Sequence, residues 1–391
     1  MRVGFDATVL APATRYTGTG QYAEKLIGLL LRQAPEVDFV LYGTRPASDP
    51  ELPTNGTWHP IGDFPFGRLS ALAGHLITLP RLAREHGLDL LHVPTVHTRA
   101  SLPPVPRKLP CPLVVTVHDL IPITYYGRSG EPLPWRMRAY YRWNLNAAQK
   151  AQRIITVSES SRVEILNALH VPSDRVVAIH NGVDFGCTNS AMPPWKLADG
   201  KAPYILFGGS FEPRKNLTRL IEAFDSAVEA GLEHHLVMIV DSASGHAERV
   251  RANANRLSCP ERLHFLSGLD EPTIRTVYQG ASVFIFPTLA EGFGLPPLQA
   301  MASGVPVIAS DLPIMREVLG EAAYYVDPYS VSDMADSLMA LSSDSSLRAE
   351  LAAAGPQRAA GFTWEETARR TLDIYRSVVE TSRATAIAAG S

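Results

Sequence analysis

The segment from Val283 to Ser310, VFIFPTLAEGFGLPPLQAMASGVPVIAS, limits the possible folds of this chain more than any other. Two apolar, β-rich runs flank the glycine-rich sequence EGFGL and a short stretch with helical character. Pro296 suits the first turn of that helix, and Gly304 suits its end. The N–H groups of such a turn, together with the helix dipole, form a site for an anion. Glu291 at the mouth of this site would meet hydroxyl groups, so the segment indicates a ligand that joins an anion to a polyol, such as a sugar nucleotide.

Runs of β-branched residues alternate with helical patterns along the whole chain. Strands are expected at Arg2–Ala7, Val37–Tyr42, Leu90–Val93, Leu113–His118, Arg153–Ser158, Val176–His180, Tyr204–Gly208, His235–Val240, Leu263–Phe265, Val283–Phe286, Val305–Ala309 and Ala323–Val326. Helices are expected at Gly20–Gln33, Ser70–Glu85, Trp135–Gln149, Glu159–Leu169, Leu217–Glu229, Ala247–Leu257, Glu271–Gln279, Pro296–Ser303, Ile314–Leu319, Val331–Ser342 and Ser345–Gly355. This alternation predicts an α/β fold with parallel sheets covered by helices on both faces.

The length of 391 residues is sufficient for two domains with full cores. The composition shifts over FGCTNSAMPPWKLADGKA, which has little periodicity and contains two adjacent prolines. We therefore expect a doubly wound N-terminal domain at 1–188, a linker at 189–202 and a second doubly wound domain at 203–363. Near the C-terminus, Thr363 and Glu366 fit a capping box for a helix over about 364–381. The Ala/Ser/Thr-rich tail after Thr381 is expected to fray.

Charge and cysteine content exclude several classes of protein. The net charge of -3 gives no reason to expect nucleic acid as a partner. Cys111, Cys187 and Cys259 are scattered and lack CxxC spacing, which argues against a disulfide framework or a zinc site and favours a reducing cytoplasm. The N-terminal sequence MRVGFDATVLA carries Asp6 within its short apolar stretch and reads as a first strand, not as a signal peptide. No uncharged apolar run reaches 18 residues, so we expect no membrane span.

Two adjacent cations follow a glycine-containing strand end in the second half. Gly208 and Gly209 end a strand, and Arg214 and Lys215 directly precede a helix in ILFGGSFEPRKNLTRL. Such a pair suits a diphosphate, because a departing nucleoside diphosphate needs its growing charge neutralised. The alternative is a charged loop before a surface helix.

In the first half, VVTVHDLIPI places His118 at the end of an apolar strand. In open α/β sheets, ligands bind beyond the carboxyl ends of the strands, so we expect His118 to face a substrate. The neighbouring Asp119 would orient the ring, contact a sugar or cap the following turn; the sequence leaves these alternatives open. Gly18 and Gly20 in TGTGQY would allow backbone amides to approach phosphates, although ordinary loop glycines fit nearly as well.

The stretch Tyr125–Leu145, YYGRSGEPLPWRMRAYYRWNL, interleaves arginines with aromatic residues. On a helix, this pattern suits an anionic interface, either a phospholipid surface or a lipid-linked pyrophosphate acceptor. The alternative is a helix that packs its aromatic side on the sheet and leaves its arginines in water. A peripheral position on the cytoplasmic face of a membrane therefore stays open.

The motifs EGFGLPPLQAMASGVPVIAS, FGGSFEPRKNL, VTVHDLIPI, TVSESSR and HNGVD occur in one order over nearly the whole chain. In this the chain resembles the retaining glycosyltransferases of family 4, which have the GT-B fold, and in particular mannosyl- and rhamnosyltransferases of bacterial surface polysaccharide synthesis. The resemblance implies two Rossmann-like domains that face a cleft, with the acceptor on the N-terminal side and the nucleotide sugar on the C-terminal side. It also implies that the last helix returns to the N-terminal domain and that neither a metal nor a further cofactor is needed.

The resemblance also assigns roles to individual residues. Arg214 and Lys215 match the family's diphosphate-binding cations, Glu291 matches the first carboxylate of an E-x7-E element near the donor hexose, and His118 matches a histidine near the transferred sugar. The remaining donor-site expectations are Gly18, Gly20, Gly209, Ser210, Gly292, Phe293, Gly294, Leu295 and Gln299, with Asp119 as a sugar contact.

The chain departs from the family pattern at two positions. Gln299 replaces the second glutamate, which grips the ribose hydroxyls in the family. A carboxylate accepts charge-assisted hydrogen bonds of roughly 1.5–3 kcal/mol each, and an amide oxygen accepts at about half that. This change suggests that the nucleoside is held less through its ribose, and a deoxyribose donor such as dTDP-rhamnose, which lacks the 2′-hydroxyl, would fit it. A GDP-mannose-like donor is the alternative. Ser210 stands where many members carry an arginine, which leaves the phosphates to Arg214 and Lys215.

The sequence is compatible with several mechanisms and functions. Double displacement needs a carboxylate nucleophile, for which Glu291 and Asp119 are candidates; the resemblance instead favours front-face attack, with the leaving phosphate accepting the proton of the acceptor. Alternatives are another GT-B enzyme, such as a sugar-nucleotide epimerase or an inverting transferase, and a non-catalytic sugar-nucleotide or glycan-binding subunit. A dinucleotide oxidoreductase fits poorly, because a strand–GxGxxG–helix unit is absent. Acceptor choice is expected to depend on loops around 63–67, 95–99 and 125–135.

Overall fold

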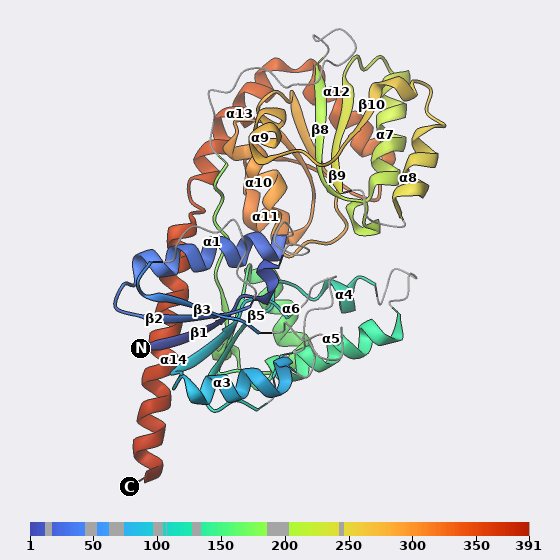
Figure 1. Ribbon diagram of the computed structural model, residues 1–391. Coiled ribbons are helices and arrows are strands. Elements are labelled where there is room, and N and C mark those ends of the chain that lie inside the picture. Colours follow the sequence, from blue (N-terminus) through green and yellow to red (C-terminus); the bar gives the residue numbers. More distant parts are fainter. Residues whose placement is uncertain are drawn as a thin grey trace. The chain divides into compact units, whose positions relative to one another are not determined.

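The computed structural model describes residues 1–11, 18–43, 53–61, 74–96, 105–106, 108–126, 134–185, 203–241 and 246–390. The chain divides into two compact units (Figure 1). Unit 1 comprises Met1–Gly182 and Thr363–Ser391, and unit 2 comprises Val183–Phe362. The expected linker at 189–202, Cys187 and most of the expected acceptor loops lie outside the described residues.

The described strands of unit 1 form one seven-stranded parallel sheet in the order β3-β2-β1-β4-β5-β6-β7. These strands are β1 (Arg2–Asp6), β2 (Asp38–Tyr42), β3 (Gly56–His59), β4 (Leu90–Val93), β5 (Leu113–Thr116), β6 (Arg153–Thr156) and β7 (Val176–Ala178). The direction in which strands are added reverses between β1 and β4. This reversal is the switch point at which doubly wound sheets bind their ligands.

Helices cover both faces of this sheet. They are α1 (Gly18–Gln33), α3 (Leu79–Glu85), α4 (Ile121–Thr124), α5 (Trp135–Ala148), α6 (Glu159–Leu169) and α14 (Trp364–Gly390), with a π-helical turn at Gly74–Thr78 before α3. Alternate side chains of the strands enter two separate cores, because successive residues of a strand point to opposite faces. Phe5 and Phe39 pack with α1 and α14, whereas Val40 and Val115 lie in the core that contains residues of α3, α5 and α6.

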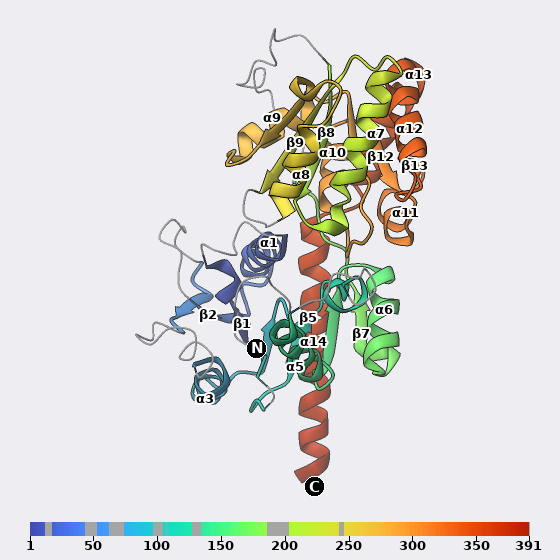
Figure 2. The ribbon, with the colours of Figure 1, turned by 90° about the vertical axis from the view of Figure 1, so that its right-hand side faces the viewer.

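Helix α14 is longer than the sequence analysis expected. Its N-terminus has the expected cap, in which the N–H of Glu366 donates to Thr363 Oγ1 at 3.2 Å. The Glu366 carboxylate, however, pairs with Arg369 and does not complete a capping box. The expectation that the tail frays after Thr381 is wrong, since the helix continues to Gly390. Alanine-rich sequence favours helix even without packing, and α14 runs on past the body of unit 1 (Figures 1 and 2).

Unit 2 repeats the same plan. Its described strands form a six-stranded parallel sheet in the order β10-β9-β8-β11-β12-β13. They are β8 (Tyr204–Ser210), β9 (His235–Asp241), β10 (Leu263–Leu266), β11 (Val283–Phe286), β12 (Val307–Ser310) and β13 (Tyr324–Val326). The helices are α7 (Leu217–Glu229), α8 (His246–Ala254), α9 (Glu271–Gln279), α10 (Leu295–Ala302), α11 (Pro313–Leu319), α12 (Val331–Ser343) and α13 (Ser345–Ala359). The switch point of this sheet lies between β8 and β11.

The expected elements that fall on described residues are present, with ends shifted by a few residues in most cases. Two short elements were missed: β3, a half-exposed edge strand, and α4, a single turn in IPIT. Their sequences are too short for a periodic pattern. Helix α13 does not end at Gly355 as expected. It passes through Pro356 and continues to Ala359.

Candidate functional site

The predicted diphosphate cations and Glu291 lie at the switch point of unit 2. Strand β8 ends at Ser210, and the chain then enters a 3-10 turn at Pro213–Lys215 directly before α7. Strand β11, the neighbour of β8, leads through the EGFGL turn into α10. The carboxyl ends of adjacent parallel strands meet at one edge of the sheet, so two segments about 75 residues apart in the sequence come together.

One carboxylate oxygen holds the two cations together. Glu291 Oε1 accepts hydrogen bonds from Arg214 Nη1 at 2.5 Å, from Lys215 Nζ and from Thr288 Oγ1 at 3.1 Å. The side chains of Glu291 and Lys215 are only 10% and 7% exposed. Lys215 Nζ also lies 4.6 Å from the centre of the Phe286 ring, a cation–π contact. The structure thus brings together the three unit 2 residues that the sequence singled out for catalysis.

The positive and negative charges around Glu291 offset one another. Burial alone would raise the pKa of Glu291, but the charges of Arg214 and Lys215 outweigh burial and lower it, so the carboxylate is ionised. Burial lowers the pKa of the Lys215 ammonium, while the attraction of Glu291 opposes that shift. Arg214 Nε lies 2.7 Å from a second carboxylate, that of Glu212. We call Glu212, Arg214, Lys215 and Glu291 the charged cluster; it contains two cations and two anions.

The glycines around the cluster stand where neighbouring side chains leave no room for a Cβ atom. A Cβ on Gly208 would lie 2.3 Å from Tyr278 Oη, and one on Gly209 would lie 2.9 Å from Phe207 Cζ. Gly294 has φ +96°, in the left-handed region, and a Cβ there would meet Met315 Cε at 2.7 Å. Larger residues at these positions would force the strand ends and the turn apart.

The EGFGL turn offers fewer backbone donors than a typical helix start. Pro296 and Pro297 follow Leu295 in the first turn of α10 and lack N–H groups. The Phe293 side chain is buried edge-to-face against Phe362, with ring centroids 5.9 Å apart, so it belongs to the core of unit 2. The positive end of the α10 dipole remains as the contribution of this turn to anion binding.

Gln299 and Ser210, the two departures from the family pattern, are half-buried. Gln299 lies one turn after Leu295 on α10 and shares its helix face. Within the described part of the chain, no hydrogen bond is formed by either side chain. Both polar groups are therefore available to a ligand.

Three residues of this site were not singled out from the sequence. Glu212 pairs with Arg214, and the buried Thr288 donates to Glu291. Asn216 has φ +62°, and its Nδ2 donates to the carbonyl oxygens of Pro287 at 3.0 Å and Pro328 at 2.6 Å. It thereby ties the turn after β8 to the loop after β11. The only sequence signal that could have identified these three residues is their position, because each stands within three residues of a predicted site residue.

In unit 1, His118 follows β5 and is half-buried. Its Nε2 lies 3.0 Å from the carbonyl oxygen of Pro94, and because a carbonyl only accepts, Nε2 must carry the proton. The Tyr22 ring packs edge-to-face on the imidazole, with centroids 4.7 Å apart. Burial lowers the pKa of His118 to about 4. At neutral pH the ring is therefore uncharged, and its Nδ1 is a hydrogen-bond acceptor.

The other predicted unit 1 residues lie near helix starts. Asp119 Oδ1 accepts from the N–H of Ile121 at 3.0 Å, a local bond in the turn that leads into α4. Gly18 and Gly20 occupy the first turn of α1. The preceding residues, 12–17, lie outside the described part of the chain.

Two buried polar groups at the strands of unit 1 were also missed. Asp6, at the end of β1, accepts from Thr8 Oγ1 at 2.6 Å and lies 2.8 Å from His75 Nε2. Burial would raise the pKa of Asp6, but these partners lower it overall. His92 on β4 lies 2.6 Å from the hydroxyl of Tyr375 on α14 and 2.9 Å from Thr116 Oγ1. These bonds tie α14 to the sheet.

Two further findings concern the described part of the chain as a whole. It contains no group of three or more His, Cys, Asp or Glu side chains arranged to hold a metal ion. It also contains no helix that combines the length and apolar character needed to cross a bilayer.

Two parallel, doubly wound units are the components of the GT-B class of α/β proteins. The chain aligns with the solved structure of WaaG, a glycosyltransferase involved in lipopolysaccharide biosynthesis, with a TM-score of 0.70 and 16% identity over 95% of this chain and 99% of that one. A sucrose-phosphate synthase from Thermosynechococcus elongatus aligns with a TM-score of 0.75 and 16% identity over 97% and 100% of the two chains. At this identity, the likeness establishes the fold.

Sequence comparison establishes the family. The model "Glycosyltransferase Family 4" matches residues 16–186, and "Glycosyl transferases group 1" matches residues 192–358. The two models together cover most of the chain, which therefore belongs to the family 4, group 1 glycosyltransferases.

The curated relatives include mannosyltransferases. The serotype-specific mannosyltransferase WbdA of Escherichia coli is 29% identical over 290 residues, or 70% of this chain, and the match spans about a third of WbdA (34%). O-antigen chain mannosyltransferase B of Escherichia coli is 28% identical over 67% of this chain and 70% of the relative. A phosphatidyl-myo-inositol mannosyltransferase of Mycobacterium leprae is 31% identical over 57% and 59% of the two chains.

Proposed function

We propose that this chain is a retaining hexosyltransferase that moves a sugar from a nucleoside-diphosphate donor to a glycan or lipid-linked acceptor. The observation that carries the proposal is the charged cluster at the β8/β11 switch point. There, two cations lie beside a buried carboxylate where doubly wound sheets bind ligands. The family to which the chain belongs supports the same activity.

In the proposed reaction, the cluster stabilises the leaving group. The bond between the anomeric carbon and the phosphate oxygen breaks as the acceptor oxygen approaches the same face, and the leaving phosphate takes the acceptor's proton. Arg214, Lys215 and the N-terminal end of α10 neutralise the charge that grows on the diphosphate. Glu291 and Asp119 need not act as nucleophiles, since Glu291 is bonded to two cations and Asp119 accepts the N–H of Ile121 in the turn before α4.

Donor binding would rearrange the cluster. The diphosphate brings negative charge to cations that Glu291 and Glu212 now neutralise, so it competes with these carboxylates for Arg214 and Lys215. A Glu291 carboxylate released from the cations becomes an acceptor for hexose hydroxyls. In unit 1, the neutral His118 offers Nδ1 to a hydroxyl in the same way.

The sugar and the nucleotide are a finer question. The relatives described as mannosyltransferases favour a mannose-like hexose. Gln299 favours a nucleoside held weakly through its ribose, as a dTDP-linked deoxyhexose would be. Both donors fit the proposal, and the nucleotide distinguishes them.

Thermal stabilisation by nucleotides tests this point. A ligand that binds only the folded chain raises its melting temperature by mass action. We expect GDP, UDP or dTDP to stabilise the wild-type chain, and we expect Gln299→Glu to improve binding of GDP and UDP more than that of dTDP, which lacks the 2′-hydroxyl. A clear preference of the wild type for GDP or UDP over dTDP would end the deoxyribose hypothesis. Stabilisation by none of the three would contradict the donor site itself.

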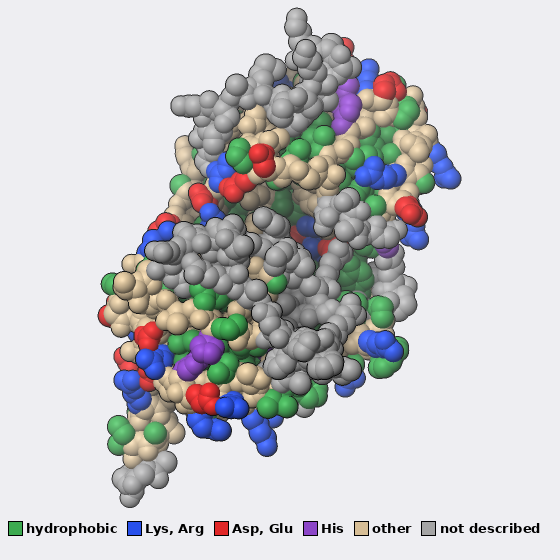
Figure 3. All heavy atoms as spheres, viewed as in Figure 1, with side chains coloured by type: hydrophobic (Ala, Val, Ile, Leu, Met, Phe, Trp, Pro, Cys, Tyr) green, Lys and Arg blue, Asp and Glu red, His purple; other side chains and the backbone are tan. Residues whose placement is uncertain are grey.

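We also propose peripheral membrane contact through α5. Trp135 is 73% exposed and Trp143 is 36% exposed, and Arg136, Arg138 and Arg142 are exposed on the same helix. Basic and hydrophobic side chains lie along the border of unit 1 near α5 (Figure 3). Exposed tryptophans with arginines suit the headgroup region of an anionic bilayer. The packing alternative holds for Leu145 and Ala148, which pack against the sheet, and Tyr141 on the same helix is also buried.

A non-catalytic sugar-nucleotide-binding subunit is the second candidate, and Gln299 is the observation that favours it. Turnover of a sugar nucleotide by the pure chain distinguishes it from the transferase.

A further inference from the structure

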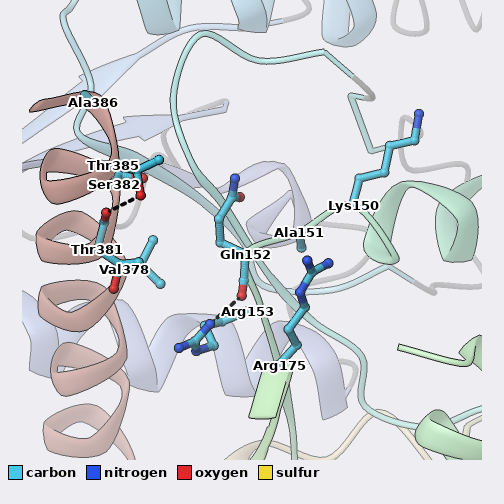
Figure 4. A pocket seen from close by; sticks show the side chains of 10 residues that line it. All are labelled: Lys150, Ala151, Gln152, Arg153, Arg175, Val378, Thr381, Ser382, Thr385 and Ala386. Carbon is cyan, nitrogen blue, oxygen red and sulfur yellow. Dashed lines mark hydrogen bonds between the residues drawn. The ribbon is translucent and has the colours of Figure 1, made fainter. Parts of the chain in front are cut away.

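A cationic pocket lies in unit 1 between the projecting part of α14 and the starts of two strands. The pocket has a volume of about 500 Å³. Val378, Thr381, Ser382, Thr385 and Ala386 of α14 form one wall, and Lys150, Ala151, Gln152, Arg153 and Arg175 form the other (Figure 4). We call this site the cationic pocket. It shares no residue with the charged cluster or with His118 and Asp119.

The position of the pocket separates it from the expected substrate site. Arg153 is the first residue of β6, and Arg175 directly precedes β7. Both therefore lie at the amino ends of parallel strands, whereas His118 and Asp6 lie at the carboxyl ends of β5 and β1. Ligands that react in doubly wound folds bind at the carboxyl edge. A ligand of the cationic pocket would bind at the opposite edge of the sheet.

The charges in the pocket are not balanced. None of the described residues that line it is a carboxylate, and Lys150, Arg153 and Arg175 form no ion pair with any described residue. The guanidinium of Arg153 donates only to the carbonyl oxygen of Gln152, at 2.9 Å. Many arginines elsewhere on the described surface do have carboxylate partners, as Arg81 has Glu85 and Arg369 has Glu366. Arg153 and Arg175, with Lys150 at the margin of the hollow where its side chain extends away from α14 (Figure 4), create a local positive potential that an anion would relieve.

The remaining lining residues narrow the class of anion. None of the ten is aromatic, so the pocket offers no stacking surface for a nucleobase. Ser382 adds a hydroxyl that has no partner among the described residues, whereas Thr381 and Thr385 donate to carbonyl oxygens one turn earlier, at 2.8 and 2.9 Å. Two arginines, a lysine and a free hydroxyl are donors that match the oxygens of a phosphate group.

We propose that the cationic pocket binds a phosphate group at the sheet edge opposite the sugar-transfer chemistry. The group belongs either to a phospholipid headgroup or to a small soluble phosphate, and the chemistry of recognition is the same for both. The end of α14 contributes a full wall although most of it beyond Val379 is exposed to solvent. Occupation of the pocket therefore fixes this end of the helix against β6 and β7.

The test compares two variants with equal loss of charge. In the first, Lys150→Gln, Arg153→Gln and Arg175→Gln are combined. In the matched control, the exposed Arg32, Arg84 and Arg256 are changed to glutamine instead. Both variants keep Arg214 and Lys215, so any binding of phosphate at the charged cluster is common to them. Thermal melting confirms that each is folded.

Two binding measurements on the full chain follow, at low ionic strength. Calorimetric titration with inorganic pyrophosphate tests the soluble source. Sedimentation with vesicles of phosphatidylglycerol and phosphatidylcholine, against vesicles of phosphatidylcholine alone, tests the lipid source. We expect the pocket variant to lose at least about 10-fold in affinity for one of the two probes relative to the matched control, because it loses three charge-assisted contacts.

The outcome of the two measurements is decisive. Loss of pyrophosphate binding assigns the pocket to a soluble phosphate, and loss confined to anionic vesicles assigns it to a lipid headgroup. If the pocket variant and the matched control bind both probes equally, the pocket is no phosphate site and the proposal is wrong. Neither result depends on sugar transfer, so the proposed function can fail while this inference stands.

Discussion

Lys215 is the residue on which the proposed chemistry depends most. We predict that Lys215→Ala lowers donor turnover by about 100-fold or more, which is the usual effect of removing one group that stabilises a leaving anion. The variant leaves Glu291 bonded to Arg214 and Thr288, so the carboxylate keeps partners and the fold is retained. Initial rates of nucleoside-diphosphate release measure the effect. Lys25→Ala, on the exposed side of α1, is the matched control. Near-normal turnover of Lys215→Ala would remove this lysine from the site.

The lowered pKa of His118 predicts that the free energy of unfolding depends on pH. Its pKa in the folded chain is about 4, below the ordinary value of 6.5, because burial disfavours the charged ring. The unfolded chain therefore takes up a proton first as the pH falls. The stabilising contribution is complete above pH 6.5 and is lost as the pH falls towards 4, by roughly 3 kcal/mol.

Urea unfolding between pH 7 and pH 4 checks this prediction. We expect His118→Asn to flatten the pH dependence of the free energy of unfolding relative to the wild type. His170→Asn, which changes an exposed histidine at the end of α6, is the matched control. Equal slopes for wild type and His118→Asn would mean that folding does not lower the pKa of this ring.

At the scale of elements, α5 combines a buried face with an exposed aromatic and basic one. We predict that Trp135→Ala combined with Trp143→Ala reduces binding to phosphatidylglycerol-containing vesicles several-fold. Each indole would otherwise bury apolar surface at the headgroup level. Vesicle sedimentation measures the change. The control is Val163→Ala, which truncates a side chain that is 54% exposed on α6. If the tryptophan variant sediments like the wild type, α5 is only a packing element.

Element positions were predictable where local patterns are strong. The run VFIF gives β11 its exact ends, and Glu159–Leu169 matches α6, which Ser158 caps through its Oγ. Short edge elements such as β3 carry too few apolar residues for a period to emerge. The length of α14 was missed because its last turns are stabilised by helix propensity, not by burial.

Part of the candidate site was also predictable from local sequence patterns. Arg214, Lys215 and Glu291 stand out as charges at strand ends, and the topology brings them together. Their pairing through one carboxylate oxygen depends on side-chain packing, which a sequence pattern does not encode. Asp6 and His92 were missed because a polar residue inside an apolar strand shows its partners, here His75 and Tyr375, only once distant segments meet.

At the scale of the whole molecule, two units with the same topology follow one another along the chain. Each carries candidate site residues at the carboxyl ends of its strands, Asp6 and His118 in unit 1 and the charged cluster in unit 2. The Glu291 segment, which by itself indicated an anion and a polyol, thus becomes one part of the proposed sugar-nucleotide site in a glycosyltransferase family member. We propose that this chain transfers the sugar with retention.

Proton NMR of donor turnover by the pure chain tests that claim most directly. The donor is the mannose or rhamnose conjugate of the nucleotide that stabilises the chain best, and octyl α-mannoside serves as the acceptor probe. We predict that the new glycosidic bond, or the sugar first released to water before it mutarotates, has the same anomeric configuration as the donor, and that Lys215→Ala suppresses its formation. An inverted product would contradict front-face transfer, and a donor that stays intact in the presence of the pure, folded chain would contradict the assignment of catalysis to this chain.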